Sequence, residues 1–256
     1  MRAVGSLWWR EIIRFLRQRS RVTGALAQPV VFWLLLGGGL SGSFRPTSGG
    51  TYLQYLYPGI LCLILLFTAI FATIAVVEDR RAGFLQGVLV APVSRTAIVL
   101  GQSLGATTLA VLQGTLALAL APFAGVRVGV GGALGAVLIM AVVAFALTNL
   151  GLVIAWRMES TQGFHAIMNL VLMPIWLLSG AFFPLESAAT PLAWVMRLDP
   201  LTYGLAALRR CLTPDAVGIP PLGASLGVTC LFAAVSLAAA VATARRSSTL
   251  GRVTPA

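Results

Sequence analysis

Residues 53–77 read LQYLYPGILCLILLFTAIFATIAVV, and EDRRAGFLQGVLVAPVSR follows directly at 78–95. The first stretch carries no charge and is long enough to cross a bilayer as an α-helix, which takes about 20 apolar residues. The second stretch concentrates charge and also carries apolar residues at helical spacing. Together they predict a membrane-spanning helix that emerges into a polar loop, and such a loop is suited to docking on a partner outside the membrane.

The composition extends this prediction to the whole chain. Hydrophobic residues make up 58% of the 256 residues and charged residues 10%, whereas about a quarter of the residues in a soluble domain are charged. Six apolar runs have spanning length, at 22–42, 53–77, 97–122, 132–156, 164–184 and 220–243. These spans leave no room for a separate soluble domain. The sequence therefore predicts an all-α integral membrane protein that forms a single domain over residues 1–256.

The basic residues exclude one class of function. All 18 of them are arginine, and the sequence contains no lysine. The phosphate-binding loop of an ATPase needs a lysine to reach the β and γ phosphates, so any ATP hydrolysis must take place on another polypeptide. Chemistry that depends on a Schiff-base lysine is excluded as well.

The arginines are distributed unevenly between the two sides of the membrane. Thirteen lie in the N-terminal segment, in the loops after the second and fourth spans and in the tail at 244–256, whereas five lie in the opposite loops. Positive residues accumulate on the cytoplasmic side of membrane proteins. We therefore expect both termini in the cytoplasm, and we attribute the net charge of +11 to topology rather than to nucleic-acid binding.

The N-terminal segment, 1–21, has a basic face and an apolar face. The basic face is formed by Arg10, Arg14, Arg17 and Arg21, and the apolar face by Trp8, Ile12, Phe15 and Leu16. This pattern predicts a helix that lies in the membrane interface. The alternative is a cluster of charges that only sets the topology.

The longest connection, 185–219, predicts two short helices between the fifth and sixth spans. One runs from Thr190 to Leu198 and the other from Leu201 to Leu212, with Pro200 between them. Both are too short to cross the membrane and too apolar for a free loop. We expect them to be re-entrant helices that dip into the outer leaflet while packed on protein.

The polar loop at 78–95 carries an apolar stripe of about one and a half helical turns, which Pro92 ends. The members of the stripe are Phe84, Leu85, Val88 and Leu89. Gly83 and Gly87 each weaken the helix by about 1 kcal/mol, so a partner or a neighbouring helix must help to hold it. The pattern alone fits a docking helix and an amphipathic turn on the bilayer equally well.

Few residues of the spans carry chemistry. His165 is the sole histidine and has no paired carboxylate in a span, so we expect no catalytic site and no metal site. The three cysteines show no C-x-x-C spacing, and no disulfide framework follows from them. Polar residues at membrane depth, such as Gln113 and Asn149, are typical of hydrogen bonds between helices.

Two motifs carry a resemblance to a known family. The first comprises EDRRAGFL and LVAPVSR within 78–95, and the second comprises LSGAFFP at 178–184 and DPLTY at 199–203, with Arg209 after it. They resemble the type-2 ATP-binding-cassette (ABC) transporter permeases, in the branch of bacterial drug and lipooligosaccharide exporters. The family usually has asparagine where this chain has Asp199. The resemblance extends along the whole chain and favours the docking interpretation of the loop.

The resemblance implies a division of labour with an ABC ATP-binding subunit. The segment from Gly83 to Pro92 would be the coupling helix received by that subunit, and the interfacial helix would brace it. Polar contacts at the start of the coupling helix would come from Glu78, Asp79, Arg80 and Arg81. Family members work as two permeases with two ATPases, so this chain would form a homodimer in the bacterial plasma (inner) membrane. It would hold no cofactor, because ATP and Mg²⁺ bind to the partner.

The expected function is outward movement of a hydrophobic or amphiphilic substrate, a drug or a lipid-like molecule, along a path between the two copies. Candidate residues for the path and its outer gate are Phe32, Trp33, Phe67, Phe71, Asn169, Met173, Trp176, Phe182 and Phe183. Each of them is also compatible with a surface that faces lipid or a neighbouring helix. The alternatives are export of a polysaccharide or glycolipid, a non-transporting membrane scaffold and an intramembrane enzyme.

Overall fold

The structure is a computed structural model that describes residues 2–17, 27, 30–31, 33–35, 38–39, 51–83, 93–214 and 219–250. Every regular element among these residues is a helix. The first predicted span, 22–42, lies largely outside the described residues. The same holds for the predicted coupling helix, of which only Gly83 is described.

In the described part of the chain, five helices are long and apolar enough to cross a membrane, at Tyr52–Arg81, Arg95–Leu118, Val130–Ala155, Thr161–Ala181 and Leu222–Arg246. In chain order they are α3 (Tyr52–Ala72) with α4 (Ile74–Arg81), α6 (Arg95–Leu118), α7 (Val130–Ala155), α8 (Thr161–Trp176) with the π-helical turn Leu177–Ala181, and α11 (Leu222–Leu250). They match the second to sixth predicted spans. The all-α membrane fold is thereby confirmed.

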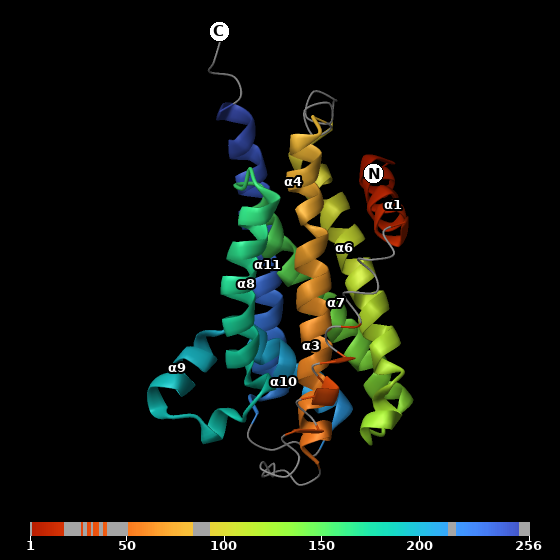
Figure 1. The fold of residues 1–256 in the computed structure, drawn as a ribbon, viewed down its shortest axis with the longest axis vertical. Coiled ribbons are helices and arrows are strands. Elements are labelled where there is room, and N and C mark those ends of the chain that lie inside the picture. Colours follow the sequence, from red (N-terminus) through yellow and green to blue (C-terminus); the bar gives the residue numbers. More distant parts are fainter. Residues whose placement is uncertain are drawn as a thin grey trace.

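α3 is the central helix of the bundle (Figure 1). Every residue from Leu56 to Ile70 is buried, and α6, α7 and α10 pack around it. α11 lies at the rim, where Leu231 and Val235 are 63% and 57% exposed. Lipid tails are as apolar as these side chains. A membrane bundle can therefore expose apolar side chains towards lipid or another protein chain at no cost in free energy.

Hydrogen bonds between neighbouring helices join two pairs of polar side chains in the spans. Ser103 of α6 donates to Oδ1 of Asn149 on α7 over 2.7 Å. Thr68 of α3 bonds the side-chain oxygen of Gln113 on α6. Gln113 and Asn149 therefore have the structural role expected of them.

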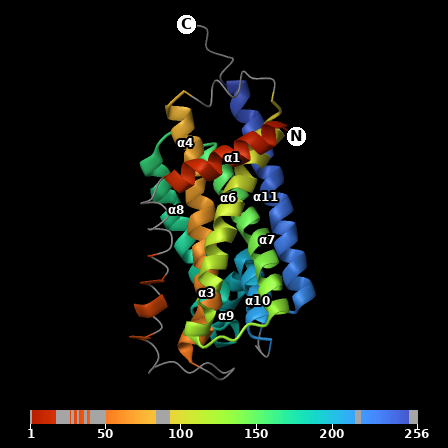
Figure 2. The same ribbon diagram turned by 90° about the vertical axis from the view of Figure 1, so that its right-hand side faces the viewer.

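The N-terminal helix, α1 (Arg2–Arg17), crosses the bundle at the end where α4 terminates (Figure 2). Two glycines of α6 allow its close approach. A Cβ at Gly101 would lie 2.7 Å from Cβ of Leu7, and a Cβ at Gly105 would lie 2.7 Å from Cβ of Glu11. Small residues four apart on a membrane helix form such a contact surface. α1 therefore packs closely on α6 at these two glycines.

The apolar face of α1 turns towards the bundle. Phe15 is 6% exposed, and the indole nitrogen of Trp8 donates to Oγ1 of Thr108 on α6 over 3.1 Å. Ile12 is half-buried and Arg17 is exposed. The helix predicted at the N-terminus is therefore present, with its apolar side packed on protein over this part of its length.

The opposite end of the bundle carries two 3-10 turns, Ala121–Ala124 and Leu185–Ser187, and the helices α9 (Thr190–Leu198) and α10 (Pro200–Leu212). α10 buries most of its residues against α3, α7 and α11. α9 projects from the bundle (Figure 1), and only Met196 of it is buried while Trp194 is 61% exposed. Both predicted short helices are observed. Both were expected to pack on protein, but only α10 is largely buried against the bundle.

Candidate functional site

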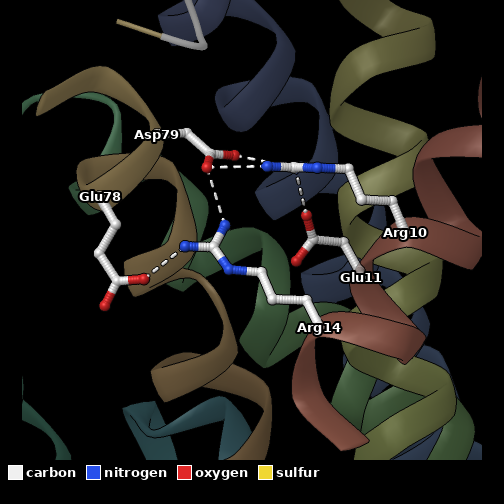
Figure 3. Close-up of polar contacts among 5 residues, drawn as sticks. All are labelled: Arg10, Glu11, Arg14, Glu78 and Asp79. Carbon is white, nitrogen blue, oxygen red and sulfur yellow. Dashed lines mark hydrogen bonds and ion pairs between the residues drawn. The ribbon is translucent and has the colours of Figure 1, made fainter. Parts of the chain in front are cut away.

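The first candidate site begins where α1 meets α4. Asp79 receives two hydrogen bonds from Arg10, Nη1 to Oδ2 and Nη2 to Oδ1, each 2.9 Å long (Figure 3). Arg14 reaches both acids of α4, with Nη1 2.8 Å from Oδ1 of Asp79 and Nη2 2.6 Å from Oε2 of Glu78. Glu11 accepts from Nη1 of Arg10 over 3.1 Å. Five charged side chains thus join two helices that are far apart in the sequence.

Burial makes this cluster stronger than an ordinary surface pair. The side chain of Asp79 is 7% exposed, and those of Arg10 and Arg14 are 31% and 23% exposed. Burial by itself lowers the pKa of Arg10, but the hydrogen bond and charge of Asp79, together with the charge of Glu11, raise that pKa above its ordinary value. Charge-assisted, two-point contacts of arginine with a carboxylate also fix geometry. The cluster therefore sets the position of α1 against α4.

Arg80 fixes α4 from the other side. Its Nη2 donates to the carbonyl of Trp156 over 2.7 Å and its Nη1 to the carbonyl of Met158 over 3.1 Å. The guanidinium also lies over the Trp156 ring, 5.9 Å from its centroid. These carbonyls belong to the C-cap residue of α7, Trp156, and to the loop after it, next to the C-terminal end of the helix, where the helix dipole favours a positive group. α4 is consequently held between α1 and the α7–α8 connection.

Gly83 ends this clamped segment. It has φ of +73°, a left-handed conformation that glycine adopts without the penalty a Cβ would bring. Gly83 directly follows Ala82, the C-cap residue of α4, and so lies two positions after the last helical residue, Arg81; this is the usual place for such a glycine. The chain therefore leaves α4 in a fixed direction as it enters 84–92.

The structure separates the predicted loop contacts into two groups. The side chains of Glu78, Asp79 and Arg80 bond within the chain, while Arg81 and Gly83 are exposed. The remaining predicted contacts, which lie outside the described residues, are Phe84, Leu85, Val88, Leu89 and Pro92. Glu78, Asp79 and Arg80 therefore position the start of the loop, and Arg81 and Gly83 are exposed where it begins.

A second cluster lies at the other end of α3. The hydroxyl of Tyr55 donates to the carbonyl of Gly180 over 2.9 Å, and Nη2 of Arg209 on α10 donates to the same carbonyl over 3.2 Å. The hydroxyl of Tyr52 donates to the carbonyl of Phe182 over 3.1 Å. The first turn of α3 thus holds the end of the fifth predicted span.

Comparison with known proteins assigns the chain to a family. The model of the ABC-2 type transporter family matches residues 2–212. The chain belongs to this family. It is 28% identical over 233 residues to Nodulation protein J of Rhizobium meliloti (strain 1021), which covers 89% of this chain and 86% of the relative. It is also 25% identical over 205 residues to a protein of Cyanophora paradoxa named as a transport permease, ycf38, covering 78% of this chain and 70% of that relative.

The candidate path residues of this ABC-2 permease fall into three environments. Trp33, Phe67 and Trp176 are buried, and Phe32 lies outside the described residues. The half-buried members are Phe71, Met173, Phe182 and Phe183. Asn169 is exposed, and its amide has no hydrogen-bond partner among the described residues. An uncovered amide in the middle of a membrane helix is suited to a polar path or a protein interface rather than to lipid.

The sequence alone assigned no role to three residues that the ABC-2 permease places beside the candidate path residues or in the second cluster. The His165 ring lies 5.2 Å from the Phe71 ring, and His165 is exposed one turn before Asn169 on α8. The spacing of four between these two polar residues was the available signal. Tyr55 and Arg209 are joined in the second cluster, and nothing in their spacing, 154 residues apart, indicates that contact.

Proposed function

We propose that this permease is the membrane subunit of a bacterial ABC exporter that moves a hydrophobic or amphiphilic substrate outward. ATP hydrolysis on a separate subunit drives the movement, and that subunit binds the ATP and Mg²⁺. The observation that carries the proposal, besides family membership, is the clamped end of α4. Asp79 and Arg80 attach it to α1 and to the α7–α8 connection, so that the loop beyond Gly83 has a rigid base to push against.

The clamp gives the loop a mechanical connection to the other end of the bundle. α3 and α4 form one helical path from Tyr52 to Arg81, 30 residues long, or about 45 Å at 1.5 Å per residue. A displacement of the coupling helix at 83–92 therefore tilts or shifts α3 as a unit. The first turn of α3 bonds the Gly180 and Phe182 carbonyls, so the movement reaches the outer end of the fifth span.

A homodimer provides the path. The central helix is fully packed, and the substrate passage lies between two copies, as in family members that work as two permeases with two ATPases. The exposed amide of Asn169 supports a path or interface along α8. The first and fifth spans then face the partner copy, and Phe182 with Phe183 forms the outer gate.

The orientation follows from the arginines. Both termini and the 78–95 loop lie in the cytoplasm, and α9 and α10 lie at the outer face of the plasma (inner) membrane. Cysteine probes in a cysteine-free chain test this arrangement, one at Ser187 and one at Ser248. A membrane-impermeant reagent should label Ser187→Cys from outside and leave Ser248→Cys unlabelled until the membrane is opened; the reverse pattern would overturn the orientation.

The decisive experiment on function is an ATPase assay of the purified permease with and without candidate ATP-binding subunits. The permease alone should hydrolyse no ATP, and addition of the cognate subunit should give activity that responds to substrate. Stimulation by glycolipids or polysaccharide intermediates, and not by drugs, would move the substrate to the alternative class. A complex that forms but transports neither would favour a scaffold.

A further inference from the structure

The outer end of the fifth span has a backbone break with an unusual carbonyl. The π-helical turn Leu177–Ala181 contains Gly180 at φ +83° and ψ 11°. A Cβ at this position would meet only the terminal methyl of Met196, at 3.9 Å, so backbone conformation rather than space requires glycine here. Turns of this kind interrupt the regular ladder and are frequent at functional sites. The carbonyl of Gly180 is thereby free to accept bonds from other segments.

Arg209 is one of its two donors, and its environment is unusual. The residue is 7% exposed, and its guanidinium carbon lies 4.2 Å from the centroid of the Tyr55 ring. Nη2 donates to the Gly180 carbonyl at 3.2 Å and to the Tyr55 carbonyl at 3.4 Å, while Nε has no hydrogen-bond partner among the described residues. Among the described residues no carboxylate forms an ion pair with it.

A buried guanidinium without a counter-ion is costly unless its donors are satisfied. The groups that stabilise Arg209 all belong to other segments, namely the first turn of α3 and the π-helical turn. A cation over a desolvated tyrosine ring is a favourable contact. If α3 separated from the π-helical turn, the Arg209 guanidinium would lose these contacts. Arg209 therefore stabilises the state in which the two segments are in contact.

The residues next to Gly180 place this contact at the gate. Phe182 follows two positions later; its carbonyl accepts from the Tyr52 hydroxyl, and its ring lies edge-on to Trp176. Tyr52 and Tyr55 are one helical turn apart on α3, so their hydroxyls and the Arg209 guanidinium hold consecutive parts of one short segment. The segment and its anchors come from α3, the π-helical turn and α10.

We propose that Arg209 is a positioning residue of the transport cycle, which holds the Gly180 carbonyl against α3 and keeps Phe182 and Phe183 across the outer end of the path. This inference rests on the proposed export function. Movement of α3, driven through the cytoplasmic clamp, loosens the three-way contact and lets the gate segment swing. The contact then forms again and closes the gate.

The neighbouring Arg210 supplies a matched control. Its side chain donates to the carbonyls of Ile219 and Pro220 at 3.0 to 3.3 Å. It therefore ties α10 to the segment that follows it, and among the described residues it makes no hydrogen bond, ion pair or ring contact with α3 or the π-helical turn. Replacement of Arg210 removes the same charge from the same helix without touching the gate.

The test measures gate opening directly. Cys62, Cys211 and Cys230 are replaced, Phe183→Cys is introduced as the single thiol, and the permease is reconstituted in proteoliposomes without nucleotide. The labelling rate with a membrane-impermeant maleimide is then compared among Arg209→Met, Arg209→Lys and Arg210→Met. Loss of the guanidinium contacts should raise the rate about fivefold. Arg209→Lys should lie between, because it keeps the charge and loses the fork, and Arg210→Met should match the parent.

Folding is monitored for each variant by its elution as a single species and by thermal unfolding. If Arg209→Met does not fold, Tyr55→Phe takes its place, since it removes one of the two donors to Gly180 and keeps the ring; a rate about twofold above the parent is expected. A folded Arg209→Met, or failing that Tyr55→Phe, that labels at the parental rate overturns the proposal, as does an equal increase in Arg210→Met. The assay uses neither ATPase nor substrate, so its outcome is independent of the test of the proposed function.

Discussion

Arg10 and Asp79, 69 positions apart in the sequence, meet in a two-point ion pair in which both nitrogen–oxygen distances are 2.9 Å. Asp79 belongs to the last turns of the central helical path, and Arg10 belongs to the helix that crosses the bundle. The pair thus connects the helix that crosses the bundle to the central helical path.

Removal of the Asp79 charge should destabilise the permease more than removal of its neighbour. Asp79→Asn leaves Arg10 and Arg14 partly buried beside a neutral amide. Breaking a fully buried ion pair costs about 3 to 5 kcal/mol. Because both arginines are partly exposed, we expect a smaller loss of about 2 kcal/mol here. Glu78→Gln should cost less than about 1 kcal/mol, since its side chain is 31% exposed. Thermal unfolding of both variants in detergent measures the difference, and equal losses would contradict the assignment of Asp79 as the centre of the cluster.

A larger side chain at Gly105, where α6 contacts α1, should displace α1. Gly105→Val places atoms where Cβ of Glu11 already lies 2.7 Å from the added Cβ, and overpacking of this kind costs about 1 to 3 kcal/mol. Gly227→Val in α11 is the matched control, because nothing lies within 4 Å of a Cβ there. Unfolding temperatures of the two variants should separate clearly. A Gly105→Val permease as stable as the control would show that the close α1–α6 contact is not required.

The spans were predictable because backbone groups inside a bilayer cannot hydrogen-bond to water. Apolar runs of spanning length must satisfy their own hydrogen bonds, which favours helices. In the structure the hydroxyl of Ser94, which precedes the third predicted span, accepts from the backbone of Ala97 and caps α6. The short helices α9 and α10 were predictable for a similar reason, since Pro200 separates two apolar runs too short to span.

The partners of the charged residues were not predictable. Arginine spacing on α1 indicates a basic face, but only the fold shows that Arg10 and Arg14 turn that face to α4 rather than to lipid headgroups. Sequence also predicted Asp79 and Arg80 as contacts to another subunit, and the structure has both bonded inside the chain. The carbonyl of Gly180 became available through a π-helical turn, for which a sequence contains no distinct pattern.

Asp199 predicts a dependence of stability on pH. Its Oδ1 caps α10 by accepting from the backbone of Leu201 at 2.9 Å, and its Oδ2 is buried without a partner. Burial raises the pKa of Asp199 from 3.8 to about 7, although the backbone hydrogen bond opposes the shift. Between these two values the folded state binds more protons than the unfolded state. The contribution of the protonated carboxyl is therefore complete below about pH 4 and is lost as the pH rises towards 7.

Asp199→Asn should remove this dependence, because the amide keeps the cap and does not ionise. The variant is expected to be more stable than the parent at pH 8 by on the order of 4 kcal/mol, at about 1.4 kcal/mol per pH unit of the shift. The gain should disappear near pH 4. Glu186→Gln, an exposed acid in the same connection, serves as the control. A gain of equal size at both pH values would mean that Asp199 is not buried as a neutral acid.

The central claim is that the α4 end of this ABC-2 permease is the surface that meets a separate ATP-binding subunit, and photo-crosslinking tests it most directly. A photoreactive amino acid is placed at Arg81, exposed at the end of α4, or at Trp194, 61% exposed on α9 at the other end of the bundle. Each variant is co-expressed with the candidate ATP-binding subunit and irradiated after the complex is purified. We predict a covalent adduct with that subunit from position 81 and none from position 194. A co-purified complex that crosslinks from position 194, or that fails to crosslink from position 81, would contradict the account.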